Sequence, residues 1–256
     1  MTLHSKILGE GAPLLILHGF LGMGDNWKTL GKKFAELGYQ IHLVDQRNHG
    51  RSFHSATFNY EAMALDLKRY LDEKKLNTVK LLGHSMGGKT AMTFATLNKD
   101  RVDQLMVADI SPRFYPVHHD AILNGLEQLD FDTISSRSEA DERLTKYVSD
   151  TGTRQFLLKN LYWVEKGKLG LRINLPVLSS EVSEVGEALE PFAKFLGPTL
   201  FLRGDKSEYI QGADELLIHQ HFPNVKIVTI ENAGHWLHAE NPRAFYSVVS
   251  DFIRDE

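Results

Sequence analysis

The chain has 256 residues, a formal net charge of −4, a hydrophobic fraction of 42% and no cysteine. This composition is typical of a globular protein that can bury about three quarters of its unfolded surface. It excludes disulfides and thiolate chemistry, and the acidic balance without a run of Lys and Arg argues against a nucleic-acid partner.

The start of the chain carries no recognisable targeting segment. Its first eleven residues, MTLHSKILGEG, are polar and contain no apolar signal-peptide core. The apolar run that follows at 14–17 is too short to span a bilayer. We therefore expect a cytoplasmic protein without a membrane span, whose oligomeric state the sequence leaves unknown.

Short apolar runs alternate with helix-like stretches along the first hundred residues. The pattern predicts strands at 14–17, 41–44, 79–82 and 105–108 and helices at 25–37, 60–71 and 86–97. Parallel strands need long crossover connections, which helices supply. The alternation therefore predicts an α/β fold with a mostly parallel central sheet and helices on both faces.

The alternation stops between 111 and 196. This segment holds charged helical stretches and an apparent hairpin around Gly167, but no comparable buried strand. Strands resume at 199–202 and 226–230, before a last helix at 242–254. We therefore predict a core formed by 1–110 and 197–256, with 111–196 inserted as a helical cap before the last two strands.

The strongest chemical motif is G-x-S-x-G at 83–87 (GHSMG), placed between a predicted strand and a predicted helix. In this context the serine occupies a sharp, strained turn, and the flanking glycines let neighbouring backbone pass closely. The N-terminus of the helix favours negative charge that develops there. We predict Ser85 as a nucleophile. The alternative is a glycine-rich turn in which Ser85 only caps the helix.

A nucleophilic serine needs donors for the oxyanion and a base. The turn at 18–20 (HGF) follows the first strand, so we expect the backbone N–H groups of Phe20 and Met86 to form an oxyanion hole. The loop after the last strand carries His235, which we predict as the base of Ser85, because this loop leaves the same edge of the sheet. The alternative is a histidine that only stabilises its turn.

Two acids could orient His235. Asp109 and Asp205 both stand at predicted strand ends. In many hydrolases the acid follows the later strand, three residues after a glycine, but that place holds Ser207. We favour Asp109 as the acid, with Ser207 as a hydrogen-bonding helper and Asp205 as the alternative acid.

Metal and nucleotide sites are the competing interpretations. His49, within 45–52 (DQRNHGRS), and the segment 118–120 (HHD) suggest metal ligands, but neither has a convincing third ligand, so we expect no metal. Residues 83–90 (GHSMGGKT) also match the phosphate-binding P-loop pattern. A P-loop would leave the turn at 18–20 and the loop that carries His235 unexplained. A binding module without catalysis is a further alternative.

Six segments together resemble the α/β-hydrolase superfamily, and most closely its bacterial serine esterases, across nearly the whole chain. They are HGFLG at 18–22, DQRNHGRS at 45–52, GHSMGGK at 83–89, ADISP at 108–112, FLLK at 156–159 and AGHWLHAE at 233–240. The resemblance implies the α/β-hydrolase fold, a helical cap and a triad of Ser85, Asp109 and His235. One departure is GDKS at 204–207, where the resemblance leads us to expect GGNS.

The resemblance also implies the chemistry. We expect cleavage of a small acyl ester, with acyl-CoA thioesters as a further option, and no cofactor. Cofactor-free haloperoxidases and carbon–carbon bond hydrolases share these motifs and are the alternatives. Aromatic residues near the ends of the cap should line the substrate pocket, because such pockets are mostly apolar. They are Phe114, Tyr115, Phe156 and Trp163.

Overall fold

The computed structural model of the protein describes residues 2–116 and 119–254. Its centre is a seven-stranded sheet in the order β1-β3-β2-β4-β5-β8-β9. Only β1 runs antiparallel to its neighbour. The mostly parallel α/β sheet predicted from the sequence is therefore confirmed. The strands are β1 (Ser5–Leu8), β2 (Ala12–Leu17), β3 (Tyr39–Val44), β4 (Val79–His84), β5 (Val102–Ala108), β8 (Thr199–Gly204) and β9 (Val225–Ile230).

Helices cover both faces of this sheet, because alternate side chains of each strand point to opposite faces. On β2, Leu15 and Leu17 pack with α2 (Tyr60–Lys74) and α3 (Met86–Leu97). The intervening Leu14 and Ile16 pack with the opposite layer. That layer contains α1 (Lys28–Ala35) and α10 (Pro242–Arg254), whereas α8 (Glu215–His221) joins the first layer.

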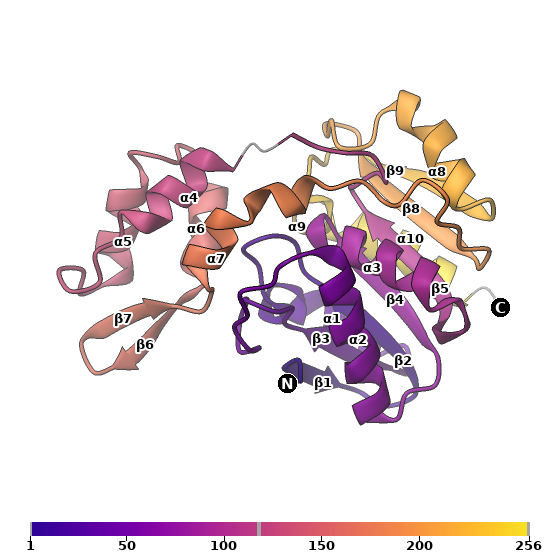
Figure 1. Ribbon diagram of the computed structural model, residues 1–256, viewed down its shortest axis with the longest axis horizontal. Helices are drawn as coiled ribbons and strands as arrows, with labels where there is room; N and C mark the ends of the chain where they lie inside the picture. Colours follow the sequence, from indigo (N-terminus) through magenta and orange to yellow (C-terminus); the bar gives the residue numbers. More distant parts are fainter. Residues whose placement is uncertain (1, 117–118, 255–256) are drawn as a thin grey trace.

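A largely helical segment connects β5 to β8 and lies to one side of the sheet (Figure 1). It has an apolar core of its own, which packs on Phe20, Leu21 and Met86 of the sheet's loops. The division into a core and a cap at the predicted boundaries stays a prediction. The elements of this segment are α4 (Asp120–Glu127), α5 (Arg137–Leu144), α6 (Thr151–Leu158), β6 (Leu161–Glu165), β7 (Lys168–Leu171), α7 (Leu175–Ser180) and η3 (Val182–Gly186).

Local capping interactions fix several helix starts. Asn59 accepts a hydrogen bond from the Ala62 N–H at the start of α2, and Ser136 and Asp150 do the same for α5 and α6. Short elements complete the chain: η1 (Gly24–Trp27), η2 (Lys99–Arg101), η4 (Gly212–Asp214) and α9 (Leu237–Glu240). Across 2–116 and 119–254, no helix combines the length and hydropathy required to cross a bilayer.

Candidate active site

Ser85 lies on a sharp turn between β4 and α3. Its backbone has φ 53° and ψ −120°, a conformation that residues with a side chain rarely adopt. A Cβ at Gly83 would lie 2.1 Å from the Gly87 carbonyl oxygen, and one at Gly87 would lie 2.5 Å from that of Leu17. The two glycines of the motif are thus required by close backbone contacts, and the strained turn presents Ser85 at the carboxyl end of the sheet.

Two backbone N–H groups next to this serine are available for a ligand. Within the described part of the chain, neither the Phe20 nor the Met86 N–H donates a hydrogen bond. Both residues are buried and lie in the apolar cluster that joins the sheet's loops to the helical segment above. Unpaired buried donors are costly unless a ligand satisfies them. The arrangement therefore fits an anion-binding position beside Ser85.

The turn that carries Phe20 is held by two buried, neutral histidines. His18 donates from Nδ1 to the Gly19 carbonyl (2.8 Å) and accepts at Nε2 from the Gln46 N–H (3.0 Å). His49 donates from Nδ1 to the Arg47 carbonyl (2.9 Å) and accepts at Nε2 from the Leu21 N–H (3.1 Å). Burial lowers the pKa of His18 to about 4 and that of His49 to about 3. Both rings are fully engaged in shaping the turn.

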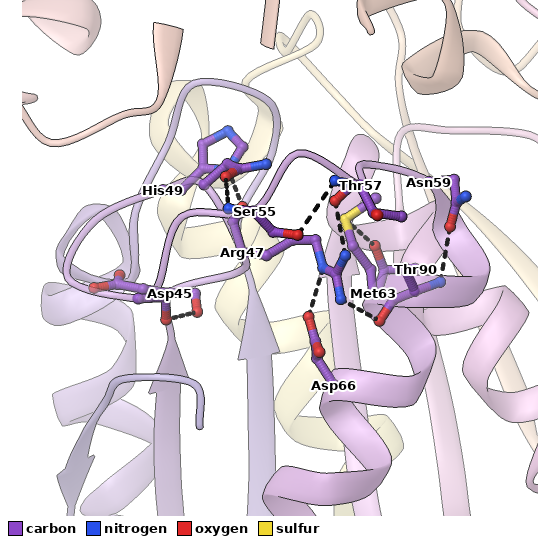
Figure 2. Close-up of polar contacts among 12 residues, drawn as sticks. Asp45, Arg47, His49, Ser55, Thr57, Asn59, Met63, Asp66 and Thr90 are labelled. Atoms are coloured by element: carbon purple, nitrogen blue, oxygen red, sulfur yellow. Dashed lines mark hydrogen bonds and ion pairs between the residues drawn. The ribbon is translucent and has the colours of Figure 1, made fainter. Parts of the chain in front are cut away.

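The rest of the segment at 45–52 is structural (Figure 2). The Arg47 guanidinium forms a 2.6 Å ion pair with Asp66 and also donates to the Thr57 and Ala62 carbonyls. Asp45 accepts hydrogen bonds from the Gly24 and Arg51 N–H groups. No set of three or more His, Asp or Glu side chains that could hold a metal occurs among the described residues, and His118 lies outside them.

The structure brings Asp109 and His235 together. Asp109 follows β5, is fully buried, and accepts a 2.8 Å hydrogen bond from His235 Nδ1. The Ser207 hydroxyl donates to the same carboxylate oxygen, and the Gly204 N–H donates to the other (3.1 Å). Asp109 itself has a φ of 53°. This carboxylate therefore holds the His235 ring with Nε2 left for a partner on the opposite side.

Asp205, the alternative acid, contacts the backbone of the His235 loop instead of the imidazole. Its carboxylate accepts from the Ala233 N–H (2.9 Å), and hydrogen bonds from the Asn232 and Ala233 backbone lower its pKa. Glu240 braces the same loop by accepting from the Gly234 and Trp236 N–H groups. Both acids act on the loop that carries His235.

Two neighbours of His235 were not predicted from the sequence. Tyr209 stacks on its imidazole, with ring centroids 3.8 Å apart. His84, the residue before Ser85, donates from Nε2 to the His235 carbonyl (2.8 Å) and so links the Ser85 turn to the His235 loop. Burial keeps the pKa of His84 well below its usual value. Its place in G-x-S-x-G was the signal, because the residue before the serine must lie under the turn.

Ser85 and His235 both line one cavity of about 220 Å³, which we call the main chamber. No hydrogen bond joins their side chains among the described residues. Its wall includes Phe20, Phe156 and Trp236. Trp236, which follows His235 and was not predicted as a site residue, thus belongs to the site. The sequence held no signal for its orientation.

Of the four aromatic residues predicted to line the pocket, two line a cavity next to Ser85 and two do not. Phe156 lines the main chamber. Tyr115 lines a second space of about 10 Å³, which we call the small recess, next to Ser85 and Met86. Phe114 and Trp163 are each 53% exposed, and neither lines the chamber or the recess. The structure therefore does not bring these two aromatics to Ser85, because Phe114 faces outward and Trp163 lies on the β6–β7 hairpin.

Lys89, the lysine of the P-loop pattern, is buried and turned away from the serine turn. Its ammonium donates to the carbonyls of Pro112 (3.2 Å), Arg113 (2.6 Å) and Glu187 (2.5 Å). Burial, with the charge of Arg113, lowers its pKa to about 7. All three ammonium hydrogens are therefore engaged, and the lysine has no donor left for a phosphate at 83–90.

Comparisons with known proteins agree with this geometry. A profile of the alpha/beta hydrolase fold matches residues 12–242. The chain is 36% identical over 253 residues to the sn-1-specific diacylglycerol lipase ABHD11 of Danio rerio, covering 96% of this chain and 80% of that protein. It is 34% identical over 249 residues to esterase YbfF of Escherichia coli, covering 96% and 94%. A solved marine microorganism esterase has a TM-score of 0.95 and 38% identity, covering 98% and 99%. These similarities confirm the predicted resemblance to bacterial esterases.

Proposed function

The chain belongs to the alpha/beta hydrolase fold family, and from that premise we propose that it is a serine esterase acting on small acyl esters. In this proposal Ser85 is the nucleophile, His235 its base and Asp109 the acid that orients the imidazole. Ser207 assists Asp109 through its hydrogen bond to the carboxylate. The N–H groups of Phe20 and Met86 hold the oxyanion.

The reaction proceeds through an acyl-enzyme. Ser85 Oγ bonds to the ester carbonyl carbon while His235 takes its proton, and the negative charge on the carbonyl oxygen is stabilised by the two N–H groups. His235 then gives the proton to the departing alkoxide. Water then attacks the acyl-enzyme carbonyl while His235 takes its proton, and His235 returns this proton to Ser85 Oγ as the carboxylic acid is released. Asp109 stays ionised and stabilises the imidazolium.

One observation carries the proposal: a strained serine and an aspartate-bound histidine line the same chamber, beside two unpaired N–H groups. Thioester cleavage, haloperoxidase chemistry and carbon–carbon bond hydrolysis share the motifs, but no contact in the site favours them over ester cleavage. Nucleotide binding is disfavoured because Lys89 is fully engaged elsewhere. We expect a small-molecule partner, with cytoplasmic location staying a prediction.

The test is the hydrolysis of p-nitrophenyl acetate by the native protein and by Ser85→Ala. We expect the substitution to lower kcat by at least ~10⁴-fold, because nucleophile and base act as a unit. The circular dichroism spectrum and Tm should change little. Residual turnover within tenfold of the native protein would contradict the assignment of Ser85.

A further inference from the structure

Two spaces of very different size meet at Ser85. The main chamber, of about 220 Å³, contains His235 and Trp236 in its wall. The small recess, of about 10 Å³, lies on the Met86 side and does not include His235. Apart from Ser85, the described residues that the two spaces share are His119 and Tyr209. An ester that reacts with Ser85 can place one half in each of these spaces.

Proton transfer decides which half goes where. When the tetrahedral intermediate collapses, the bond from carbon to the alcohol oxygen breaks and that oxygen takes the proton held by His235. The acid must lie within about 3 Å of the oxygen that it protonates. The alcohol half therefore leaves through the space that His235 lines, and the acyl half remains on the Met86 side.

We propose that the enzyme is selective for esters of a short acyl group, acetyl or little larger, with a bulky apolar alcohol. The acyl methyl occupies the small recess, and the alcohol chain extends through the main chamber past Phe156 and Trp236. This inference rests on the proposed esterase function and adds the substrate class to it.

The recess is small and its walls are fixed. A space of about 10 Å³ admits about one water-sized group, so it takes a methyl with little adjustment. Val182 and Val185 form one wall, which is hydrogen-bonded to the rest of the protein. Tyr60 donates to the Val185 carbonyl (2.7 Å), and the Tyr115 N–H donates to the Gly186 carbonyl (2.8 Å).

Lys89 strengthens the same wall from behind. Its ammonium binds carbonyls on both chain segments that flank the recess, at Arg113 and at Glu187. Enlarging the recess for a longer acyl chain would separate these segments and leave carbonyls unpaired. Packed walls of this kind discriminate by about 10–200-fold per methylene.

On the alcohol side, by contrast, the main chamber borders a further space. Phe156 and Trp236 have ring centroids 4.3 Å apart and line both the main chamber and an outer cavity of about 430 Å³. Thr153 is likewise common to the two spaces. In this proposal, a chain attached to the alcohol oxygen runs from His235 over these two rings toward the outer cavity and buries apolar surface along its length.

Isomeric esters give the sharpest test, because they have equal composition and similar hydrophobicity. Butyl acetate places four carbons on the alcohol side, and ethyl butanoate places four on the acyl side. We expect kcat/KM, measured by acid release at constant pH, to be at least tenfold higher for butyl acetate. Equal rates, or a preference for ethyl butanoate, would overturn the proposal.

Matched substitutions assign the preference to the two sides. Trp236→Ala should lower the kcat/KM ratio of butyl acetate to methyl acetate at least fivefold, whereas Trp163→Ala, on the exposed hairpin, should leave it unchanged. Val185→Ala should raise the ratio of ethyl butanoate to ethyl acetate at least fivefold. Val164→Ala is the control for Val185→Ala, because Val164 is 54% exposed. Unchanged ratios in Trp236→Ala and Val185→Ala would overturn the assignment of the two spaces.

The two measurements distinguish an error in the substrate class from an error in the esterase assignment. If p-nitrophenyl acetate is cleaved only when Ser85 is present, the esterase assignment stands whatever the isomer ratio. An isomer ratio near one would then overturn the substrate class alone. If Ser85→Ala leaves p-nitrophenyl acetate turnover intact, the proposed function itself is wrong.

Discussion

Asp109 occupies an unusual place for a single side chain. It is fully buried, has a left-handed backbone with φ 53°, and accepts hydrogen bonds from His235, Ser207 and Gly204. A buried carboxylate needs such partners, and its charge in turn orients and stabilises the imidazole. Asp205, the residue after the end of β8, is exposed, and its carboxylate accepts from the Ala233 N–H instead.

The different contacts of Asp109 and Asp205 predict different effects on kcat when each is replaced by Asn. Asp109→Asn should lower kcat by about 10⁴-fold, because an amide favours the wrong tautomer of His235. Asp205→Asn keeps an acceptor for the Ala233 N–H and should lower kcat by less than about tenfold. Steady-state kinetics on p-nitrophenyl acetate measures both, and the opposite order would make Asp205 the acid.

At the scale of elements, Lys89 connects α3 to both ends of the segment between β5 and β8. Its ammonium is the shared donor for carbonyls before α4 and after η3. Lys89→Met would keep much of the apolar stem but leave three carbonyls without this donor. Burial disfavours the ammonium, as its lowered pKa indicates, but three carbonyls would lose their donor, and we expect this loss to outweigh the relief. The free energy of unfolding at pH 6, measured by urea denaturation, should fall by at least about 2 kcal/mol.

Lys68→Met is the matched control, since Lys68 lies exposed on α2 and should change the stability by less than about 0.5 kcal/mol. Equal stability of Lys89→Met and Lys68→Met would show that the buried ammonium does not tie these segments together.

Some strands and helices could be predicted from the sequence, and others could not. Strands such as β4 and β5 were predictable because they are continuous apolar runs buried on both faces. The edge strand β1 was missed, since its four residues are largely half-buried and follow no buried run. The helices between β5 and β8 were recognisable, but their packing on the sheet was not. Sequence could therefore not distinguish Trp236, in the chamber wall, from Trp163, on the exposed hairpin.

The strand–turn–helix context of Ser85 could be predicted from the sequence, because strand, glycines and helix all lie within 79–97. The placement of Asp109 against His235 depends on contacts between residues 126 positions apart. The sequence therefore could not decide whether Asp109 or Asp205 contacts His235, whereas the structure shows the hydrogen bond from His235 to Asp109.

The whole molecule contains a group of buried histidines whose neutral form it requires. Burial lowers their pKa to about 4 for His18 and His42 and to about 3 for His49 and His238, and keeps that of His84 well below its usual value. In the unfolded chain each titrates near 6.5. Between these values the unfolded state binds more protons, so stability is full above pH about 6.5 and declines as the pH falls toward 4.

We therefore expect the free energy of unfolding to fall by roughly 1 kcal/mol per pH unit for each such histidine below pH about 6.5. Urea denaturation at a series of pH values between 7.5 and about 5 measures this slope. His238→Phe keeps an aromatic ring stacked on Trp27 and removes one titrating group, so its slope should be shallower. A flat stability profile, or an unchanged slope in His238→Phe, would contradict the requirement for neutral histidines.

We propose that His235 activates Ser85, and covalent labelling measures that activation. A fluorophosphonate reacts with a serine that a base has activated, and peptide mapping by mass spectrometry locates the adduct. We predict a single adduct on Ser85 in the native protein and at least ~100-fold slower labelling in His235→Ala. Labelling of another residue, or equal rates with and without His235, would contradict the claim.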